Sequence, residues 1–427
     1  MKTRVLMFGW EYPPEISGGL GIATHGLLHG LTKQGTSVKF VIPTYKKQTA
    51  KTAWEIISAG DVKMVSRSVL EEKHWEKISY IEVGAMLMPY ISLDDYRKLE
   101  EKKESGITQQ VRVLKETYEF GGGYGENLME EVSRFALIGA QLASKNDFDV
   151  IHGHDWMTYP AALAAGAKSG KPVVLHVHST EIERSLAHLA QDIYDLERKC
   201  LENADHVIAV SQLTKDILLL HYKLDESKIT VVHNSFSQEF VKPVTKKKFP
   251  SKNPTITFLG RMARQKAPTL FVDVAKSLSD RNPNYRFVMA GEGYLIDEIK
   301  QKVYQMNLQE RFSFPGFLSS EEVKKVFAKT DVFLMPASAE PFGMVALEAA
   351  YSGVPVVLSK QSGAIEVLPS AHKFECWQTF RMADTIDEMI HHPKKALNYA
   401  KKIQKEARKT SWDKAAKKTI GVYKKLK

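Results

Sequence analysis

The most constraining feature of the sequence is its regular alternation of short apolar, β-branched runs with longer helical stretches. We expect strands at residues 4–8, 38–42, 150–154, 173–178, 207–210, 229–232, 255–259, 287–290, 312–314, 332–335 and 354–358. Helical segments such as 129–145, 270–279 and 321–329 lie between them. This alternation builds βαβ units, in which parallel strands form a sheet that helices cover on both faces. The sequence therefore predicts an α/β fold with doubly wound parallel sheets.

The series of strands restarts after a stretch rich in Lys, Pro, Ser and Asn at residues 246–254. Two parallel-sheet domains fit this restart better than one very wide sheet does. We assign residues 1–245 to an N-terminal domain and residues 254–408 to a C-terminal domain. Residues from about 54 to 124 are charged and turn-rich, so we interpret them as an insertion in the first domain.

The distribution of charge limits the class of partner. A formal charge of +10 is compatible with an acidic partner such as nucleic acid. However, residues 401–427 hold eleven basic and two acidic residues, and so carry +9 of this charge. Apolar residues interrupt the run at helical spacing, which predicts an amphipathic helix with solvated lysines. We expect no nucleic-acid partner, while a weak contact of the basic C-terminus with a membrane or polyanion stays open.

Cysteine content and hydropathy exclude two further classes. Cys200 and Cys376 are the only cysteines, and neither lies in a metal-ligand spacing, so neither a disulfide framework nor a zinc–cysteine site is expected. No run reaches the ~18 apolar residues of a membrane helix, and the first residues do not resemble a signal peptide. We therefore expect a cytoplasmic protein.

Several candidate binding residues directly follow predicted strands. In open parallel sheets, ligands bind beyond the carboxyl ends of the strands. The first strand leads through Gly18-Gly19 into helical sequence, where glycines and a helix N-terminus suit an anion, although an ordinary turn is the alternative. After the strand at 255–259, Arg261 and Lys266 offer a forked donor and a point charge suited to a diphosphate; the alternative is a pair of surface cations.

A pair of glutamates follows the strand at 332–335. Glu340 lies in the loop after this strand, and Glu348 lies in the helical sequence that begins near Gly343. The helix N-terminus at Gly343, Met344 and Val345 is suited to hold a phosphate between the two carboxylates. A capping role for Glu340 and a packing role for Glu348 are the alternatives, but the combination with two nearby cations favours a binding site.

With these motifs the chain resembles the retaining nucleotide-sugar glycosyltransferases of families 4 and 5 over nearly its whole length. The resemblance rests on the glycine loop at 18–20, on Gly260-Arg261 with Lys266, on the glutamates separated by seven residues, and on His233-Asn234. The motifs at 152–156 and 176–181 are similar to those of bacterial and archaeal glycogen synthases. The resemblance implies a GT-B fold, in which two Rossmann-like domains face a cleft. A final helix, residues 409–427, would then return to the N-terminal domain.

The resemblance also implies roles for individual residues. Glu340, His178 and His154 would form the catalytic group, with Glu340 near the anomeric centre of the donor sugar. The residues expected to bind the nucleotide-sugar donor are Gly19, Arg261, Lys266, Gly343, Met344, Val345 and Glu348. For any of these histidines a buried polar role is the alternative, and His152 and His176 do not match a family position.

The implied enzyme is a retaining hexosyltransferase that moves glucose from a nucleoside diphosphate sugar to an α-glucan, as a glycogen synthase does. The alternatives are a transferase to a lipid or small glycoside and a non-catalytic nucleotide-sugar-binding protein. Ile16 stands where starch-synthase-type enzymes often carry lysine, which weakens the case for ADP-glucose in particular. We expect no cofactor and no metal, because the D-x-D sequence Asp147–Asp149 precedes its strand and so belongs at the edge opposite the site.

Overall fold

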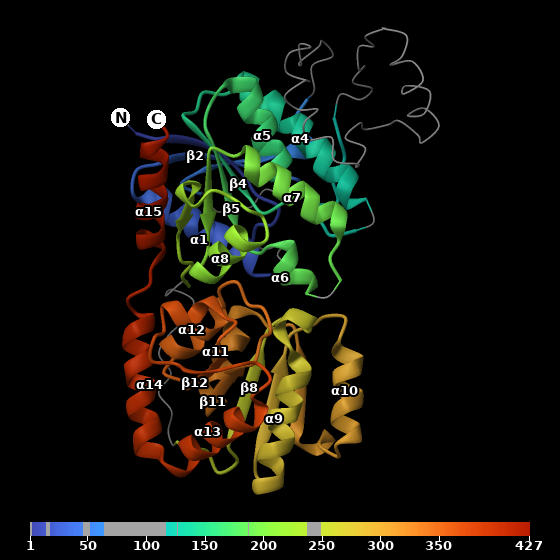
Figure 1. Cartoon of the computed structure of the whole chain (residues 1–427), viewed down its shortest axis with the longest axis vertical. Coiled ribbons are helices and arrows are strands. Elements are labelled where there is room, and N and C mark those ends of the chain that lie inside the picture. The colour runs from blue at the N-terminus through green and yellow to red at the C-terminus, as the bar shows by residue number, and fades with distance from the viewer. Residues whose placement is uncertain are drawn as a thin grey trace.

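Strands and helices alternate along the chain, and the computed structural model confirms the predicted α/β fold with two parallel sheets. The structure describes residues 2–13, 18–45, 52–63, 117–125, 127–186, 188–236 and 249–427. The two sheets belong to two domains that lie end to end (Figure 1).

The first sheet has the strand order β3-β2-β1-β4-β5-β6-β7, and all its pairs are parallel. Its strands are β1 (Arg4–Phe8), β2 (Ser37–Ile42), β3 (Glu55–Ser58), β4 (Val150–His154), β5 (Val173–Val177), β6 (His206–Ala209) and β7 (Ile229–Val231). The helices of this domain are α1 (Gly19–Lys33), α4 (Leu128–Lys145), α5 (Tyr159–Ser169), α6 (Glu181–Ser185), α7 (Gln191–Asn203) and α8 (Gln212–Leu220), with short 3₁₀ turns η1 (Ala59–Asp61) and η2 (Glu226–Lys228). The strand order reverses between β1 and β4, and ligands bind at such switch points in open α/β sheets.

The second sheet repeats this arrangement with the order β10-β9-β8-β11-β12-β13. Its strands are β8 (Thr255–Leu259), β9 (Arg286–Ala290), β10 (Phe312–Gly316), β11 (Val332–Met335), β12 (Val356–Ser359) and β13 (His372–Phe374). The helices are α9 (Pro268–Arg281), α10 (Ile296–Gln305), α11 (Ser320–Lys329), α12 (Met344–Tyr351) and α13 (Thr379–His391), with 3₁₀ turns η3 (Arg264–Lys266), η4 (Gln309–Arg311) and η5 (Gly363–Glu366).

Alternation along the central strands distributes the core between the two faces of each sheet. In β1, Leu6 and Phe8 belong to the apolar cluster under α4 and α5, whereas Val5 and Met7 belong to the cluster under α1. Both sets are buried because helices cover both faces, which is why the strand is apolar at every position.

Two short edge strands were not expected from the sequence. Strand β3 pairs with β2 and lies inside the segment interpreted as an insertion, so that segment begins after Ser58 and not near residue 54. Strand β13 pairs with β12 at the edge of the second sheet. Each has three or four residues and lacks a continuous buried run, so its pairing depends on the neighbouring strand. Residues 64–116 of the expected insertion lie outside the described residues.

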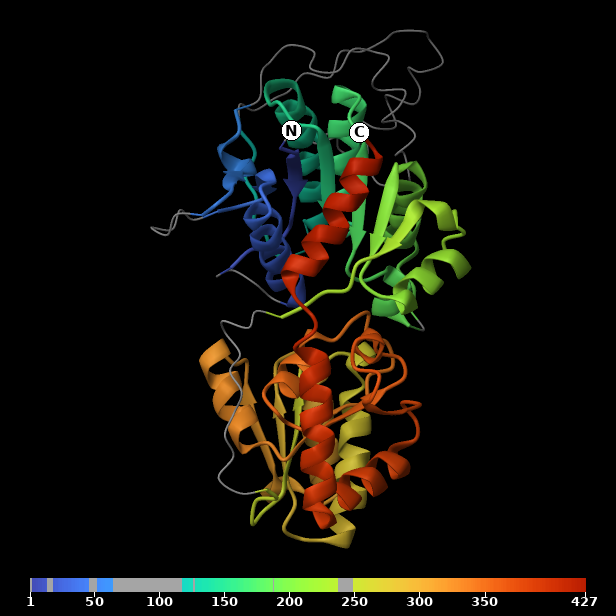
Figure 2. The ribbon, with the colours of Figure 1, turned by 90° about the vertical axis from the view of Figure 1, so that its left-hand side faces the viewer.

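The last helices join the two domains. Helix α14 (Pro393–Ala407) lies in the second domain, and α15 (Trp412–Lys425) runs along the first domain against α1 (Figure 2). The Trp412 ring occupies the space above Gly26, where an added Cβ would lie 2.1 Å from the ring. Where the chain crosses between domains, Ser235 Oγ donates to Thr410 Oγ1 at 3.2 Å, so the two crossing segments lie side by side. No helix among the described residues is long and apolar enough to cross a membrane.

Candidate active site

The candidate residues follow the carboxyl ends of strands from both sheets, and these ends meet at the domain boundary (Figure 1). The loops after β8 and β11 carry the predicted residues of the second domain, and the segments after β1, β4 and β5 carry those of the first. Helix α6, which follows β5, contacts η3, which follows β8. The topology therefore brings residues distant in sequence to one boundary.

Glu340 and Lys266 form an ion pair within the second domain. The carboxylate is buried, with 6% of Glu340 exposed, so water screens this pair less than it screens a surface pair. The two loops are joined by backbone hydrogen bonds, because the Ser338 and Ala339 N–H groups donate to the Gln265 carbonyl at 2.9 and 3.0 Å. Two predicted site residues, 74 positions apart, are thus held in contact.

The main chain of Glu340 is fixed on both sides. Its N–H donates to the Gln361 carbonyl at 2.8 Å, and its own carbonyl accepts from the Gly363 N–H at 3.0 Å. These bonds form a short parallel bridge between the Glu340 loop and the segment after β12.

Gly343 opens helix α12 in a conformation that other residues rarely adopt. Its φ of +95° lies in the left-handed region, and an added Cβ would lie 3.0 to 3.2 Å from Met335, Ser362 and Glu340. No side chain caps the helix start. The first N–H groups, at Met344 and Val345, therefore keep their capacity to bind an anion beside Glu340.

Glu348 lies one turn into α12. It is partly buried, and burial raises its pKa to about 7. Within the part of the chain that the structure describes, no group donates a hydrogen bond to its carboxylate. An unpaired, partly buried acceptor near a helix N-terminus is suited to a ligand hydroxyl.

The glycine loop of the first domain reaches across to the second. An added Cβ on Gly18 would lie 2.9 Å from Nη2 of Arg261, and one on Gly19 would lie 3.1 Å from Cε of Met344. Arg261 is exposed. The structure thus places the Gly18-Gly19 loop, Arg261 and the start of α12 together, while residues 14–17 lie outside the described residues.

His178 and His154 form a pair in the first domain. The ring nitrogens His154 Nδ1 and His178 Nε2 are 2.9 Å apart, and the tautomers decide which one donates. Asp155 Oδ1 accepts from the backbone N–H groups of His178 and Ser179 at 2.6 and 3.3 Å. Burial lowers the pKa of His178 to about 3, so this ring is neutral at pH 7. Among the described residues, no hydrogen bond or ion pair joins either histidine to the second domain.

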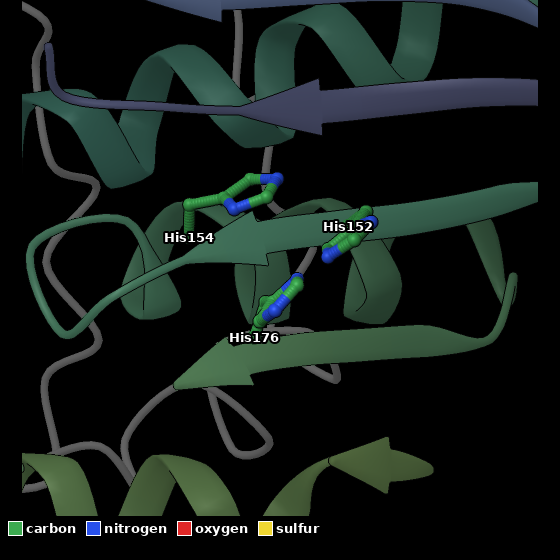
Figure 3. A group of neighbouring side chains, drawn as sticks. All are labelled: His152, His154 and His176. Atoms are coloured by element: carbon green, nitrogen blue, oxygen red, sulfur yellow. The ribbon is translucent and has the colours of Figure 1, made fainter. Parts of the chain in front are cut away.

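His154 also belongs to a buried group with His152 and His176, on neighbouring positions of β4 and β5 (Figure 3). One nitrogen from each ring lies within 4.8 Å of the other two, which makes the three residues a candidate metal group. However, the rings are stacked, with centroids 4.4 to 5.4 Å apart and planes 10° to 27° from parallel. A metal must lie near the plane of each imidazole that binds it, and stacked planes do not converge on a common point near the nitrogens. This arrangement does not form a metal centre, and metal independence stays a prediction.

The D-x-D sequence lies at the opposite edge of the first sheet. Arg4 pairs with both Asp147 and Asp149, and Lys427 Nζ lies 3.0 Å from Asp149 Oδ2. Hydrogen bonds from Arg4 lower the pKa of Asp149 well below its usual range. Both carboxylates are therefore paired with cations, away from the domain boundary.

Arg184 was not expected from the sequence. Its Nη1 donates to the Ser179 carbonyl at 2.8 Å, and its guanidinium pairs with buried Glu181 and Glu197. It therefore holds the segment directly after His178. The sequence offers only the capping box of Thr180 and Glu183, which predicts the start of α6 but not this ion-pair network.

Comparison with protein families gives two matches that together cover most of the chain. The model described as "Glycosyltransferase Family 4" matches residues 97–239, and the model "Glycosyl transferases group 1" matches residues 242–410. An uncharacterized glycosyltransferase of Methanocaldococcus jannaschii is 26% identical over 99% of this chain and 98% of its own length. The glycogen synthase of Mycobacterium tuberculosis is 24% identical over 86% of this chain and 80% of its own.

Solved structures show the same fold at lower identity. The sucrose-phosphate synthase of Thermosynechococcus elongatus has a TM-score of 0.74 at 17% identity, covering 100% of this chain and 99% of its own. Anabaena HepE in complex with UDP-glucose has a TM-score of 0.67 at 16% identity, covering 99% of this chain and 100% of its own. Together with the two family matches, the paired parallel sheets establish that this chain belongs to the group 1 and family 4 glycosyltransferases with the GT-B fold.

Proposed function

We propose that this glycosyltransferase is a retaining enzyme that moves glucose from a nucleoside diphosphate donor to the end of an α-glucan. The observation that carries the proposal is the placement of Lys266, Glu340 and the uncapped start of α12 side by side. The glycine loop of the other domain lies opposite them, beside Arg261. A diphosphate needs cations and free N–H groups, and a developing sugar cation needs a carboxylate nearby.

In the proposed reaction, the bond between the anomeric carbon and the diphosphate oxygen breaks first. Positive charge then develops on the sugar and negative charge on the leaving group. Arg261, Lys266 and the N–H groups of α12 would stabilise the diphosphate, and Glu340 would face the sugar. The acceptor hydroxyl attacks from the same face, and its proton passes to the departing diphosphate. No carboxylate nucleophile is required, and no metal has a role.

The named ligands and activities of related proteins support this choice of donor and acceptor. HepE is described in complex with UDP and glucose, with UDP-glucose, and with UDP, which supports a UDP-glucose donor. The similarity to a glycogen synthase supports an α-glucan acceptor. Other relatives transfer N-acetylglucosamine to 2-deoxystreptamine or to phosphatidylinositol, so other acceptors belong in any test.

The test is a matrix of UDP-, ADP- and GDP-glucose against glycogen, short maltodextrins and phosphatidylinositol vesicles, read by release of the nucleoside diphosphate. We expect release with glycogen or maltodextrin and retention of the α-configuration at the new linkage. Glu340→Gln should abolish turnover, whereas Glu202→Gln, which removes an exposed carboxylate that pairs with Arg198 within α7, is the control and should not. Turnover with vesicles but with neither glucan would refute the α-glucan proposal.

A further inference from the structure

Among the described residues, one carboxylate of the second domain accepts hydrogen bonds only from the first domain. Glu366 lies in η5, and its Oε2 accepts from the Gln212 N–H at 2.8 Å while its Oε1 accepts from the Leu213 N–H at 3.1 Å. His233 Nε2 lies 2.6 Å from the same Oε2. Three donors from two separate segments of the first domain therefore converge on one side chain across the boundary.

The two backbone donors are the first N–H groups of helix α8. These groups have no partner inside the helix, and the helix dipole favours a negative charge beside them. Ser211 caps the same helix from within its own domain, by accepting from the Thr214 N–H at 3.0 Å. The Ser211 cap does not use the N–H groups of Gln212 and Leu213, and these two groups donate to the Glu366 carboxylate of the other domain. The Glu366 side chain is 20% exposed, so it is largely enclosed by these contacts.

The same segment is bonded to the candidate catalytic glutamate. Gly363 opens η5, and its N–H donates to the Glu340 carbonyl at 3.0 Å. On the other side, the Gln361 carbonyl accepts from the Glu340 N–H at 2.8 Å. A turn of four residues, Gly363–Glu366, therefore connects the carboxylate at the domain boundary to the backbone of Glu340.

His233 links Glu366 to the segment that crosses between the domains. It lies two residues after β7, in the segment that crosses between the domains, and Ser235 in that segment bonds to Thr410 in the returning segment. A rotation of one domain about these crossings would draw Glu366 away from the start of α8. The hydrogen bonds of Glu366 thus depend on the angle between the domains.

We propose that Glu366 is a positioning residue, which couples the closed arrangement of the two domains to the orientation of Glu340. With the carboxylate on α8, the segment at 361–363 holds Glu340 toward Lys266. When the domains open, the carboxylate leaves α8 and the constraint on Glu340 is released. The proposal rests on the proposed function for the role of Glu340, but its structural part does not depend on any substrate.

The test compares Glu366→Ala and Glu366→Gln with Glu322→Gln. Glu322 is the matched control, because it accepts from the Ser319 N–H at 2.8 Å at the start of α11, within a single domain. Small-angle scattering with and without UDP reports the domain arrangement, and steady-state kinetics of nucleoside diphosphate release report catalysis. Glutamine keeps a carbonyl acceptor for one N–H and should rescue part of what alanine loses.

We expect Glu366→Ala to lower kcat about tenfold or more, with the KM for the donor changed by less than about threefold, because a charged acceptor is lost away from the donor. Its radius of gyration should exceed that of the wild type with UDP present, while Glu322→Gln matches the wild type in both measurements. An unchanged scattering curve for Glu366→Ala would overturn the proposal, as would an equal loss of kcat in Glu322→Gln. If the wild type itself turns over no donor, the proposed function fails, and the scattering comparison still decides the coupling to domain closure.

Discussion

The stacked histidines should make the first domain sensitive to acid. His152, His154 and His176 are at most 1% exposed, and burial lowers the pKa of each well below its ordinary value. In the unfolded chain a histidine binds a proton as the pH falls below about 6.5. The unfolded state then holds more protons than the folded state, so each of these histidines lowers the free energy of unfolding as the pH falls through this range.

The size of the effect follows from this difference in protonation. Between about pH 7.5 and 5.5, one histidine that stays neutral in the folded state removes about 1.4 kcal/mol from the free energy of unfolding. Three such residues remove about 4 kcal/mol, which is a large part of a typical domain stability of about 5–15 kcal/mol. His178 acts in the same sense, because burial also lowers its pKa, to about 3. Asp155 and Glu183 act in the opposite sense, because burial raises their pKa to about 7 and the folded state then gains protons on acidification.

A comparison between a variant and the wild type isolates the histidine contribution. The variant is His176→Leu, because both ring nitrogens of His176 lack a hydrogen-bond partner. Urea unfolding followed by fluorescence gives the free energy at about pH 7.5 and 5.5. We expect the variant to lose about 1.4 kcal/mol less than the wild type between these values. His29→Gln, at an exposed position of α1, serves as the control. Equal losses in His176→Leu and the wild type would refute the reasoning that this ring stays neutral when folded.

Four further predictions concern the donor site, the metal requirement and, in two cases, the final helix. Glu348→Gln should weaken nucleotide binding in calorimetry by about 1–3 kcal/mol with the circular dichroism spectrum unchanged, and unaltered affinity would remove Glu348 from the site. A chelator should leave turnover unchanged, because Asp147 and Asp149 form ion pairs with Arg4 and Lys427 at the edge of the sheet opposite the site. A loss of turnover that manganese restores would contradict this prediction. Trp412→Ala should destabilise the protein by about 3–5 kcal/mol in thermal or urea unfolding, since it empties the space above Gly26. Charge reversal of the exposed lysines on α15 should leave the melting temperature and the activity toward soluble glucans unchanged. A loss of vesicle binding in this variant would instead indicate a membrane contact. The lysines are Lys417, Lys418, Lys424 and Lys425.

Much of the candidate site was accessible from local sequence because its parts follow strands. Glu340, Gly343 and Arg261 each lie in a loop directly after a buried parallel strand, and such loops gather at one edge of a sheet whatever else the fold does. The ion pair of Glu340 with Lys266 needed only that β8 and β11 be neighbours, which the strand order provides. The edge strands β3 and β13 were missed because short, partly polar segments become strands only when a neighbour pairs with them.

The sequence by itself determined the class of fold, the restart that separates two sheets, and the residue types available for a diphosphate and a sugar. The fold class and the restart follow from the periodicity of apolar residues, and the candidate binding groups follow from the charge and hydrogen-bonding capacity of individual side chains, which do not depend on the fold. Only the tertiary structure decided which groups share a partner. It stacked four histidines, which lie on β4, on β5 and directly after β5. It also brought Tyr423 Oη to 2.5 Å from His152 and placed the Glu366 carboxylate at the start of a helix in the other domain. The contacts of Tyr423 and Glu366 join residues more than a hundred positions apart. No local pattern records any of these contacts, because their energy depends on burial and geometry that exist only after the chain has folded.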